Sequence, residues 1–354
     1  MTYRDHTVGV VIPAYNEEEF IGEVVESIPT YVDRIYPVDD CSTDDTWDEI
    51  TAVAERENER RTPTVHSGEV VVPVQHDRNR GAGAATLTGY RRALDDDVDL
   101  VARMDGDGQM DPAMLSHLLD PLVDGEVSYA KGDRLAGLDY VSQMSWWRLF
   151  GNVLLTALTR VSSGYWRLRD PQNGYTAITH EALDSLSFDD LFDHYGFCND
   201  VLIHLNADGY DVADVAHPAV YGDEESTIQY SSFIPRLSGL LFSRWRWRLR
   251  HQTNRTVGAI ALGSFLGSLL AVSVGVGYLL QCVTNGTSDS LETDGGTRTR
   301  QESPGVSQSV RLLLVGCLSL IVGVLADSSA DHGCVVRKGP TDADESDPSP
   351  TGAF

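Results

Sequence analysis

The segment at residues 104–109 reads Met-Asp-Gly-Asp-Gly-Gln and holds two carboxylates that flank one glycine. Its first carboxylate, Asp105, directly follows residues 100–104, a largely apolar run that is typical of a buried strand. Mg²⁺ and Mn²⁺ prefer oxygen ligands, so a pair of carboxylates at a strand end is suited to hold one such ion. The pattern predicts a metal site formed by Asp105 and Asp107. Its chemistry would be to neutralise and hold a departing diphosphate.

Three further polar segments stand where an apolar run ends and a helical pattern begins, at 13–17, 39–44 and 79–83. Taken singly, each can be an ordinary turn, and Ser42 or Thr43 can cap the helix that follows. Together with the carboxylate pair, they place four polar segments at strand ends. Helix N-termini attract anions there, and open α/β sheets bind their ligands there. The sequence therefore predicts one binding crevice at this edge of the sheet.

Apolar, β-branched runs alternate with helical spacing over the first 235 residues. The expected strands are 8–12, 35–38, 70–74 and 100–104, and the expected helices are 17–28, 43–55 and 84–94. Uninterrupted apolar strands separated by helices are typical of a mostly parallel sheet that is buried on both faces. We therefore expect an α/β fold over residues 1–235, with helices on both faces of the sheet.

The composition is strongly acidic but is not that of a disordered chain. The net charge is −26 over 354 residues, 42% of the residues are hydrophobic, and of the 27 Lys and Arg only Lys131 and Lys338 are Lys. A dense carboxylate surface stays hydrated in concentrated salt, which indicates a halophilic, haloarchaeal protein; the alternative is simply an acidic surface. A nucleic-acid partner is not expected, because it requires a basic face. An anionic substrate would have to be held by a few Arg residues and a metal.

Two apolar runs near the C-terminus differ from the rest of the chain. Residues 257–283 carry no charge over 27 positions, and residues 312–326 form a shorter run. The first is long enough to span a bilayer, and the Arg and Trp residues of 244–250 are typical of a cytoplasmic interface belt. We expect a C-terminal transmembrane helical hairpin, a multi-pass location in the cell membrane and a cytoplasmic N-terminal domain. The alternative for each run is a buried core helix.

The expected order of segments follows from these runs. It is an N-terminal domain 1–235, a basic and aromatic juxtamembrane segment 236–256, a transmembrane helix 257–283, a polar loop 284–309, a second transmembrane helix 310–326 and a disordered tail 327–354.

In order and spacing, residues 8–227 resemble the family-2 glycosyltransferases of the GT-A fold, most closely the dolichyl-phosphate mannose and glucose synthases. The resemblance rests on the four strand-end segments, on 131–134 (Lys-Gly-Asp-Arg) and on 170–175 (Asp-Pro-Gln-Asn-Gly-Tyr). It implies that the nucleotide-sugar is bound by Pro13, Tyr15, Glu17, Asp40, Asp105, Gly106 and Asp107. It implies that Asp107 is catalytic, that Mg²⁺ or Mn²⁺ is held by Asp105, Asp107 and Gln109, and that the acceptor is bound by Arg134, Arg148 and Asn152.

The resemblance implies metal-dependent, inverting transfer of a hexose from a GDP- or UDP-sugar to a polyprenyl or dolichyl phosphate at the cytoplasmic membrane face. Two departures keep an alternative open: Asn199 and Asp200 stand where these synthases carry Glu, and 221–226 lacks their Arg and Lys. The alternative is transfer to a hydroxyl of a lipid-linked glycan. A phosphate acceptor needs no protein base, whereas a hydroxyl does, and Asp200 is the candidate base. The apolar helix expected at 146–165 either lies in the membrane interface or packs in the core.

Overall fold

The computed structural model describes residues 2–61, 68–134, 146–194, 196–216, 230–251, 255–285, 304–329 and 335–338. The chain divides into two compact units, one of Met1–Arg248 with His332–Phe354 and one of Leu249–Asp331. The first unit holds a sheet with its covering helices, and the second holds two long helices.

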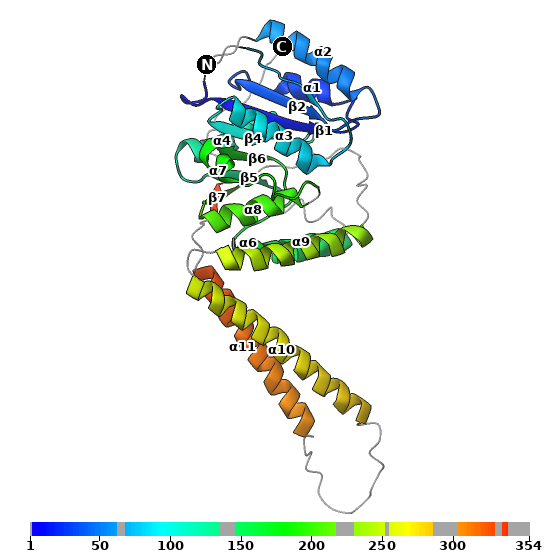
Figure 1. The fold of residues 1–354 in the computed structure, drawn as a ribbon, viewed down its shortest axis with the longest axis vertical. Coiled ribbons are helices and arrows are strands. Elements are labelled where there is room, and N and C mark those ends of the chain that lie inside the picture. Colours follow the sequence, from blue (N-terminus) through cyan, green and yellow to red (C-terminus); the bar gives the residue numbers. More distant parts are fainter. Residues whose placement is uncertain are drawn as a thin grey trace, which may run out of the picture. The chain divides into compact units, whose positions relative to one another are not determined.

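The described residues of the first unit form an eight-stranded sheet in the order β3-β2-β1-β4-β6-β5-β7-β8. Its strands are β1 (Val8–Ala14), β2 (Arg34–Asp39), β3 (Val74–Gln75), β4 (Leu100–Arg103), β5 (Tyr129–Asp133), β6 (Thr176–Thr179), β7 (Val212–Ala216) and β8 (Val335–Lys338). Only β6 runs antiparallel to its described neighbours, which are β4 and β5. The expected mostly parallel sheet is therefore confirmed (Figure 1). β8 differs from expectation, because it forms a strand within the tail that was expected to be disordered.

Helices cover both faces of the sheet, as the alternating pattern predicts. Val10 and Ile12 of β1 belong to a core with α1, α2 and α4, whereas Val11 belongs to a core with α3, α7 and α8. Successive strand residues point to opposite faces, so one strand contributes to both layers. The helices are α1 (Ile21–Ser27), α2 (Thr46–Arg60), α3 (Ala82–Asp95), the 3₁₀ turn η1 (Pro112–Met114), α4 (Leu115–Val123), α7 (His180–Ser185) and α8 (Phe197–Asp208).

Close packing of α3 on β1 leaves no room for a side chain at Gly89. A Cβ at this position would overlap the side chain of Val11. We expect Gly89→Ala to lower the free energy of unfolding by about 1–3 kcal/mol, because overpacking a tight core forces backbone shifts. Gly22→Ala in α1 is the control, since its Cβ would have only Glu49 Oε2 within 4 Å, at 3.5 Å. Urea unfolding measures both variants, and equal losses would contradict the prediction.

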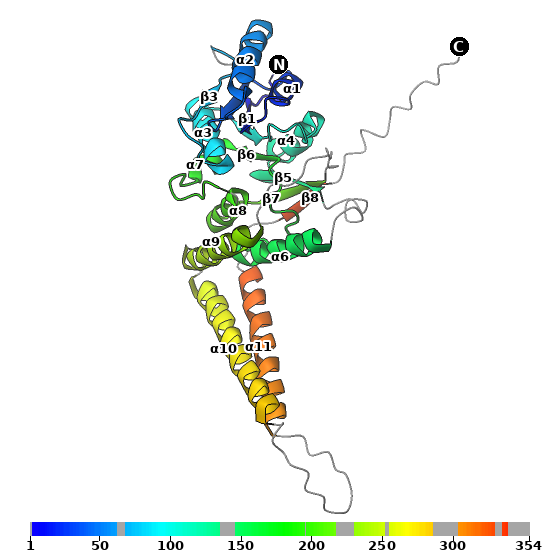
Figure 2. The same cartoon turned by 90° about the vertical axis from the view of Figure 1, so that its right-hand side faces the viewer.

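Two further helices, α6 (Trp146–Ser163) and α9 (Tyr230–His251), lie side by side in both views (Figure 1 and Figure 2). Leu155 and Leu158 of α6 join Leu237 and Leu241 of α9 in a cluster with Ile203 of α8. The C-terminal half of the 146–165 segment therefore packs in the core. This contact is the one that the core alternative predicts, and the membrane contact of the segment stays a prediction.

One residue of the Arg and Trp belt expected at the membrane is instead part of this packing. Arg248 of α9 is completely buried. Its guanidinium donates to the carbonyl oxygens of Val161 (3.2 Å) and Ser162 (2.8 Å) in the last turn of α6. The last carbonyl groups of a helix lack partners within the helix and attract cations. The interface role expected for Arg248 is therefore wrong, because the arginine closes the end of a neighbouring helix.

The second unit consists of α10 (Arg255–Asn285) and α11 (Pro304–Ser329). Small residues lie at their contact: Ser319 donates to the carbonyl oxygen of Ser264, and a Cβ on Gly316 would lie 2.8 Å from Val272 Cγ2. Over the part of the chain that the structure describes, no helix combines the length and the apolarity that a membrane crossing needs. The expected transmembrane helical hairpin is therefore wrong. The run at 257–283 has no charged residue, but it is less apolar than that suggests. Gly and Ser recur through it, and they add little hydrophobic free energy.

Most of the expected polar loop, residues 286–303, lies outside the described residues, as do 221–226 and the end of the tail at 339–354.

Candidate active site

The loops that follow β1 and β2 are joined by hydrogen bonds. The side-chain oxygen of Asn16 accepts from the backbone N–H of Thr43 at 2.8 Å, and the backbone N–H of Glu17 donates to Thr46 Oγ1 at 2.7 Å. Asn16 has a φ of +58°, a left-handed conformation that Asn tolerates. Tyr15 is 44% exposed on this loop. Two predicted donor-binding residues, Tyr15 and Glu17, thus stand on a segment that its neighbour holds in place.

Asp40, a third predicted donor-binding residue, is buried directly after β2. Its carboxylate lies 2.7 Å from His76 Nδ1 and accepts from the backbone N–H groups of Arg80 (2.9 Å) and Gly81 (2.6 Å). These contacts fix the turn that begins α3. The contact of Asp40 with the nucleotide stays a prediction. The structure shows that its carboxylate holds the backbone of Arg80 and Gly81.

The predicted metal motif lies directly against the end of β1. A Cβ on Gly106 would be 3.3 Å from the carbonyl oxygen of Pro13, so this pair of predicted residues is in contact. The Asp105 side chain is 33% exposed. Asp107 is partly exposed and accepts from the backbone N–H of Gln109 at 3.0 Å. The structure therefore gathers the predicted donor and metal residues at one edge of the sheet.

Arg103, the last residue of β4, connects this motif to two neighbouring segments. Its buried guanidinium lies 2.6 Å from Asp105 Oδ1 and donates to the carbonyl oxygen of Gly174 (2.7 Å) and to Thr86 Oγ1 (3.1 Å). Burial alone would lower the pKa of Arg103, but the Asp105 carboxylate together with the neighbouring Cys and Tyr side chains raises that pKa above its ordinary value. Arg103 thus orients Asp105 and balances its charge.

The donor atoms at this edge fit a hard divalent ion. Among the described residues, no group of three or more His, Cys, Asp or Glu side chains is placed to hold a metal by itself. Mg²⁺ usually binds through one or two carboxylates and takes its other oxygens from water and substrate phosphates. Asp105 and Asp107 match that pattern, and the side chain of Gln109 adds an amide oxygen to the same motif.

Arg134, a predicted acceptor-binding residue, follows β5 and is held by Asp170. Its Nε and Nη2 donate to the two carboxylate oxygens at 2.7 and 2.9 Å. Burial alone would raise the pKa of Asp170, but the hydrogen bonds and charge of Arg134 together with the charge of Lys131 hold that pKa below its usual range. Asp170 and Gly174 belong to one segment, and Gly174 contacts Arg103. The predicted acceptor arginine is therefore linked to the metal motif through residues 170–174.

Arg148 and Asn152, the other predicted acceptor-binding residues, occupy positions one turn apart on α6. Their side chains lie outside the described residues.

Asp200, the candidate base, is completely buried in α8. Arg244 of α9 reaches it with two nitrogens: Nη2 donates to Oδ2 at 2.9 Å, and Nε lies 2.8 Å from Oδ1. The backbone N–H of Phe192 also donates to Oδ2 at 2.9 Å. Burial raises the pKa of Asp200 and outweighs the attraction of Arg244. The structure therefore places Asp200 in the contact between α8 and α9.

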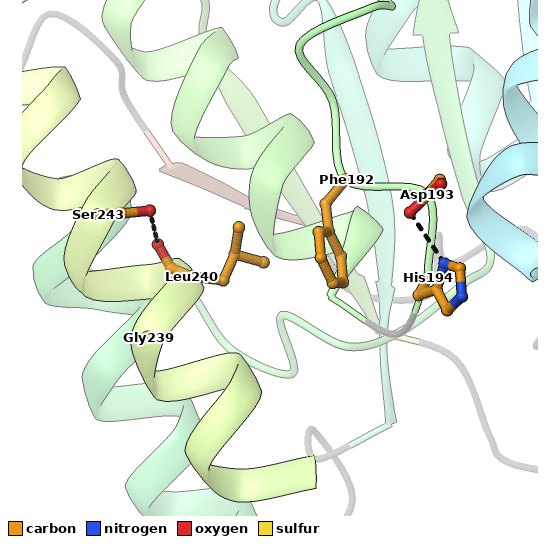
Figure 3. A pocket seen from close by; sticks show the side chains of 6 residues that line it. All are labelled: Phe192, Asp193, His194, Gly239, Leu240 and Ser243. Carbon is orange, nitrogen blue, oxygen red and sulfur yellow. Dashed lines mark hydrogen bonds and ion pairs between the residues drawn. The ribbon is translucent and has the colours of Figure 1, made fainter. Parts of the chain in front are cut away.

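A cavity of about 500 Å³ lies between α9 and the loop that precedes α8. It is lined by Phe192, Asp193, His194, Gly239, Leu240 and Ser243 (Figure 3). Phe192 and Leu240 point toward one another from its two sides, while Asp193 Oδ1 lies 2.8 Å from His194 Nδ1. The carbonyl oxygen of Asp193 accepts from the backbone N–H of Ala84 at 3.0 Å. The wall of the cavity thus contacts the start of α3.

The sequence patterns did not predict the structural roles of four buried charged residues, Arg103, Lys131, Asp214 and Arg248, or of the partly buried Arg244. One signal was available: Arg103 and Lys131 are single cations at or near the end of apolar strands. Their partners come from distant segments, and no local pattern identifies those.

Comparison with known proteins decides the family. Residues 9–186, which are half of the chain, match Glycosyl transferase family 2. The chain belongs to this family. The resemblance stated from the sequence is confirmed, and the protein is a glycosyltransferase.

Two curated relatives and one solved structure are similar to this family-2 glycosyltransferase. UDP-N-acetylglucosamine–dolichyl-phosphate N-acetylglucosaminyltransferase of Methanococcus voltae is 28% identical over 61% of this chain and 87% of that protein. Polyprenol monophosphomannose synthase of Mycolicibacterium smegmatis is 28% identical over 71% of this chain and 90% of that one. Glucosyl-3-phosphoglycerate synthase from Mycobacterium tuberculosis, solved with Mg²⁺ and uridine diphosphate, has a TM-score of 0.49 at 24% identity, over 69% and 80% of the two chains.

Proposed function

We propose that this glycosyltransferase moves a hexose, with inversion, from a GDP- or UDP-sugar to a polyprenyl or dolichyl phosphate at the cytoplasmic face of a membrane. One observation carries the proposal. The two relatives whose names give a dolichyl or polyprenol acceptor align over 87% and 90% of their own lengths. The family supports sugar transfer, and these names support the class of acceptor.

The edge formed by β1, β2 and β4 supports binding of the donor. Tyr15 and Glu17 contact the nucleoside, and Asp105 and Asp107 hold a Mg²⁺ or Mn²⁺ ion, with Arg103 keeping Asp105 in place. When bound, the ion supplies positive charge to the departing diphosphate.

The acceptor phosphate binds Arg134, which Asp170 orients. A phosphate oxygen attacks C1 of the sugar from the face opposite the diphosphate, the bond from C1 to the diphosphate oxygen breaks, and the nucleoside diphosphate leaves. A lipid phosphate is already anionic near neutral pH, so no side chain has to remove a proton.

The surroundings of Asp200 favour a phosphate over a hydroxyl acceptor. A general base must lie within hydrogen-bonding reach of the proton that it removes. Asp200 is completely buried, and Arg244 and the Phe192 N–H engage its two oxygens. In this arrangement a sugar hydroxyl has no access to the carboxylate.

The test uses the purified full chain in detergent with radiolabelled GDP- and UDP-sugars and dolichyl phosphate. We expect one donor to place label in a lipid that mild acid hydrolyses. Dolichol without phosphate is the matched control and should accept no label. Labelling of a lipid-linked glycan but not of dolichyl phosphate would contradict the proposal.

A further inference from the structure

Lys131 is a buried ammonium group in a chain that otherwise uses arginine. Only 2 of the 27 Lys and Arg residues are Lys, and this one, on β5, is 1% exposed. Its Nζ lies 2.7 Å from Asp214 Oδ1 on β7. It also donates to the backbone carbonyl oxygens of Arg169 and, at 3.1 Å, Asp170. With the carbonyl oxygen of Gly132 at 3.4 Å, four acceptors surround a group that has three N–H donors, so every donor can find a partner and the ammonium is buried at tolerable cost.

Lys131 belongs to a cluster of alternating charges at the ends of β5 and β7. The cluster pairs three cations with three anions: Lys131, Arg134, Arg169, Asp133, Asp170 and Asp214. Arg169 contributes twice, with its backbone N–H donating to Asp214 Oδ2 at 2.8 Å and its Nη1 lying 3.7 Å from Asp133 Oδ2. Burial, followed by the charge of Asp214, raises the pKa of Asp133. The balanced charges make each member depend on its neighbours.

The ammonium fixes the backbone of the residue that orients Arg134. Asp170 has a φ of +35°, a region that residues with a Cβ occupy only when surrounding contacts hold them there. Lys131 donates to the carbonyl oxygens of Arg169 and Asp170, which precede and follow the Cα of Asp170. The carboxylate of Asp170 then engages one edge of the Arg134 guanidinium with both of its oxygens.

We propose that Lys131 is a positioning residue for the acceptor phosphate, acting through Asp170 on Arg134. The inference rests on the proposed function and deepens it, because it names the internal support of the acceptor arginine. Lys131 touches no substrate in this role. It holds the 169–170 peptide so that Asp170 presents Arg134 at a fixed angle beside the metal motif.

The arrangement requires a lysine and not merely a positive charge. The ammonium directs its N–H groups toward a carboxylate and two carbonyl oxygens that lie around one point, whereas a guanidinium is planar and larger. We therefore expect Lys131→Arg to fail although it keeps the charge. Lys338→Arg, which changes the only other lysine, is the matched control.

The experiment measures the KM for dolichyl phosphate, the kcat and the affinity for nucleotide in the full chain. We expect Lys131→Arg and Lys131→Gln to raise the acceptor KM about tenfold or more and to leave the affinity for nucleotide unchanged. A tenfold change is the effect of losing about one charge-assisted hydrogen bond. Lys338→Arg should behave as wild type. Arg134→Ala should raise the acceptor KM at least as far, and adding Lys131→Gln to it should cause no further rise, because residues that act through one another are not additive.

The possible outcomes separate the two proposals. A wild-type chain that labels no dolichyl phosphate with any donor overturns both of them. A wild-type chain that labels the lipid, with Lys131→Arg at a wild-type acceptor KM, overturns only the role of Lys131. Additive losses in the double variant also overturn it, because Lys131 would then act by a route other than Arg134. If Lys131→Gln does not fold, the comparison of Lys131→Arg with Lys338→Arg still decides the question.

Discussion

We expect Asp107→Asn to reduce sugar transfer by about 10³-fold, which corresponds to about 4 kcal/mol of lost transition-state stabilisation. The substitution keeps the size of the side chain and removes the charge that a divalent ion needs. Asp107 is partly exposed at the sheet edge and accepts from the backbone N–H of Gln109, a hydrogen bond that an Asn amide oxygen can also accept. Its loss should therefore leave the fold intact. Asp105→Asn should reduce transfer as strongly, but it also removes the counter-charge of buried Arg103 and should lower stability.

The measurement combines transfer rates with a binding signal that does not depend on turnover. Titration of Mn²⁺ in the presence of nucleoside diphosphate, followed by electron paramagnetic resonance, should show binding by wild type and weaker binding by Asp107→Asn. Asp95→Asn, on the exposed last residue of α3, controls for the general loss of one negative charge. EDTA should abolish transfer and added Mg²⁺ or Mn²⁺ should restore it. Full activity in EDTA would refute a metal at this motif.

The arrangement of the early sheet could be predicted because its signals are local. The run at 8–12 is entirely apolar and forms β1 (Val8–Ala14), and the spacing at 84–94 matches α3 (Ala82–Asp95). The strand predicted at 70–74 is only partly present. Val74–Gln75 forms a strand, and Val71 makes an isolated bridge with Ile35. β3 is an edge strand with one neighbour, so pairing and not propensity sets its length.

The internal support of the site could not be predicted, because it depends on contacts between distant segments. Arg103 contacts Gly174, 71 residues away, and Arg248 contacts Ser162, 86 residues away. Nothing in the sequence near an arginine shows whether it faces water, a membrane or the end of another helix. The Arg and Trp belt was read from type and spacing alone, and burial decides otherwise for Arg248. The apolar runs at the C-terminus show the same limit, since length without charge does not by itself make a membrane span.

We expect Asp200→Asn to lower the free energy of unfolding by about 3 kcal/mol, near the low end of the range for breaking a buried ion pair. Asp200 is completely buried, whereas the Arg244 side chain is 18% exposed and keeps some solvation. The variant leaves Arg244 without its counter-charge at the contact of α8 with α9. In a chain of this size the loss should lower the Tm by about 10 °C.

The same variant separates the two acceptors. If the acceptor is a phosphate, Asp200→Asn should keep kcat within a few-fold of wild type per folded molecule, measured well below its Tm. A lost general base would instead reduce kcat by about 10²–10⁴-fold. Asp200→Asn combined with Arg244→Met is the matched control, because it removes both charges of the pair. We expect this double variant to recover part of the lost stability. Replacing both members of a buried ion pair by neutral groups costs less stability than removing one member and leaving the other charge without its partner. A large loss of kcat in Asp200→Asn with unchanged nucleotide affinity would reverse our choice of acceptor, because it would mean that a hydroxyl reaches Asp200 in the working enzyme.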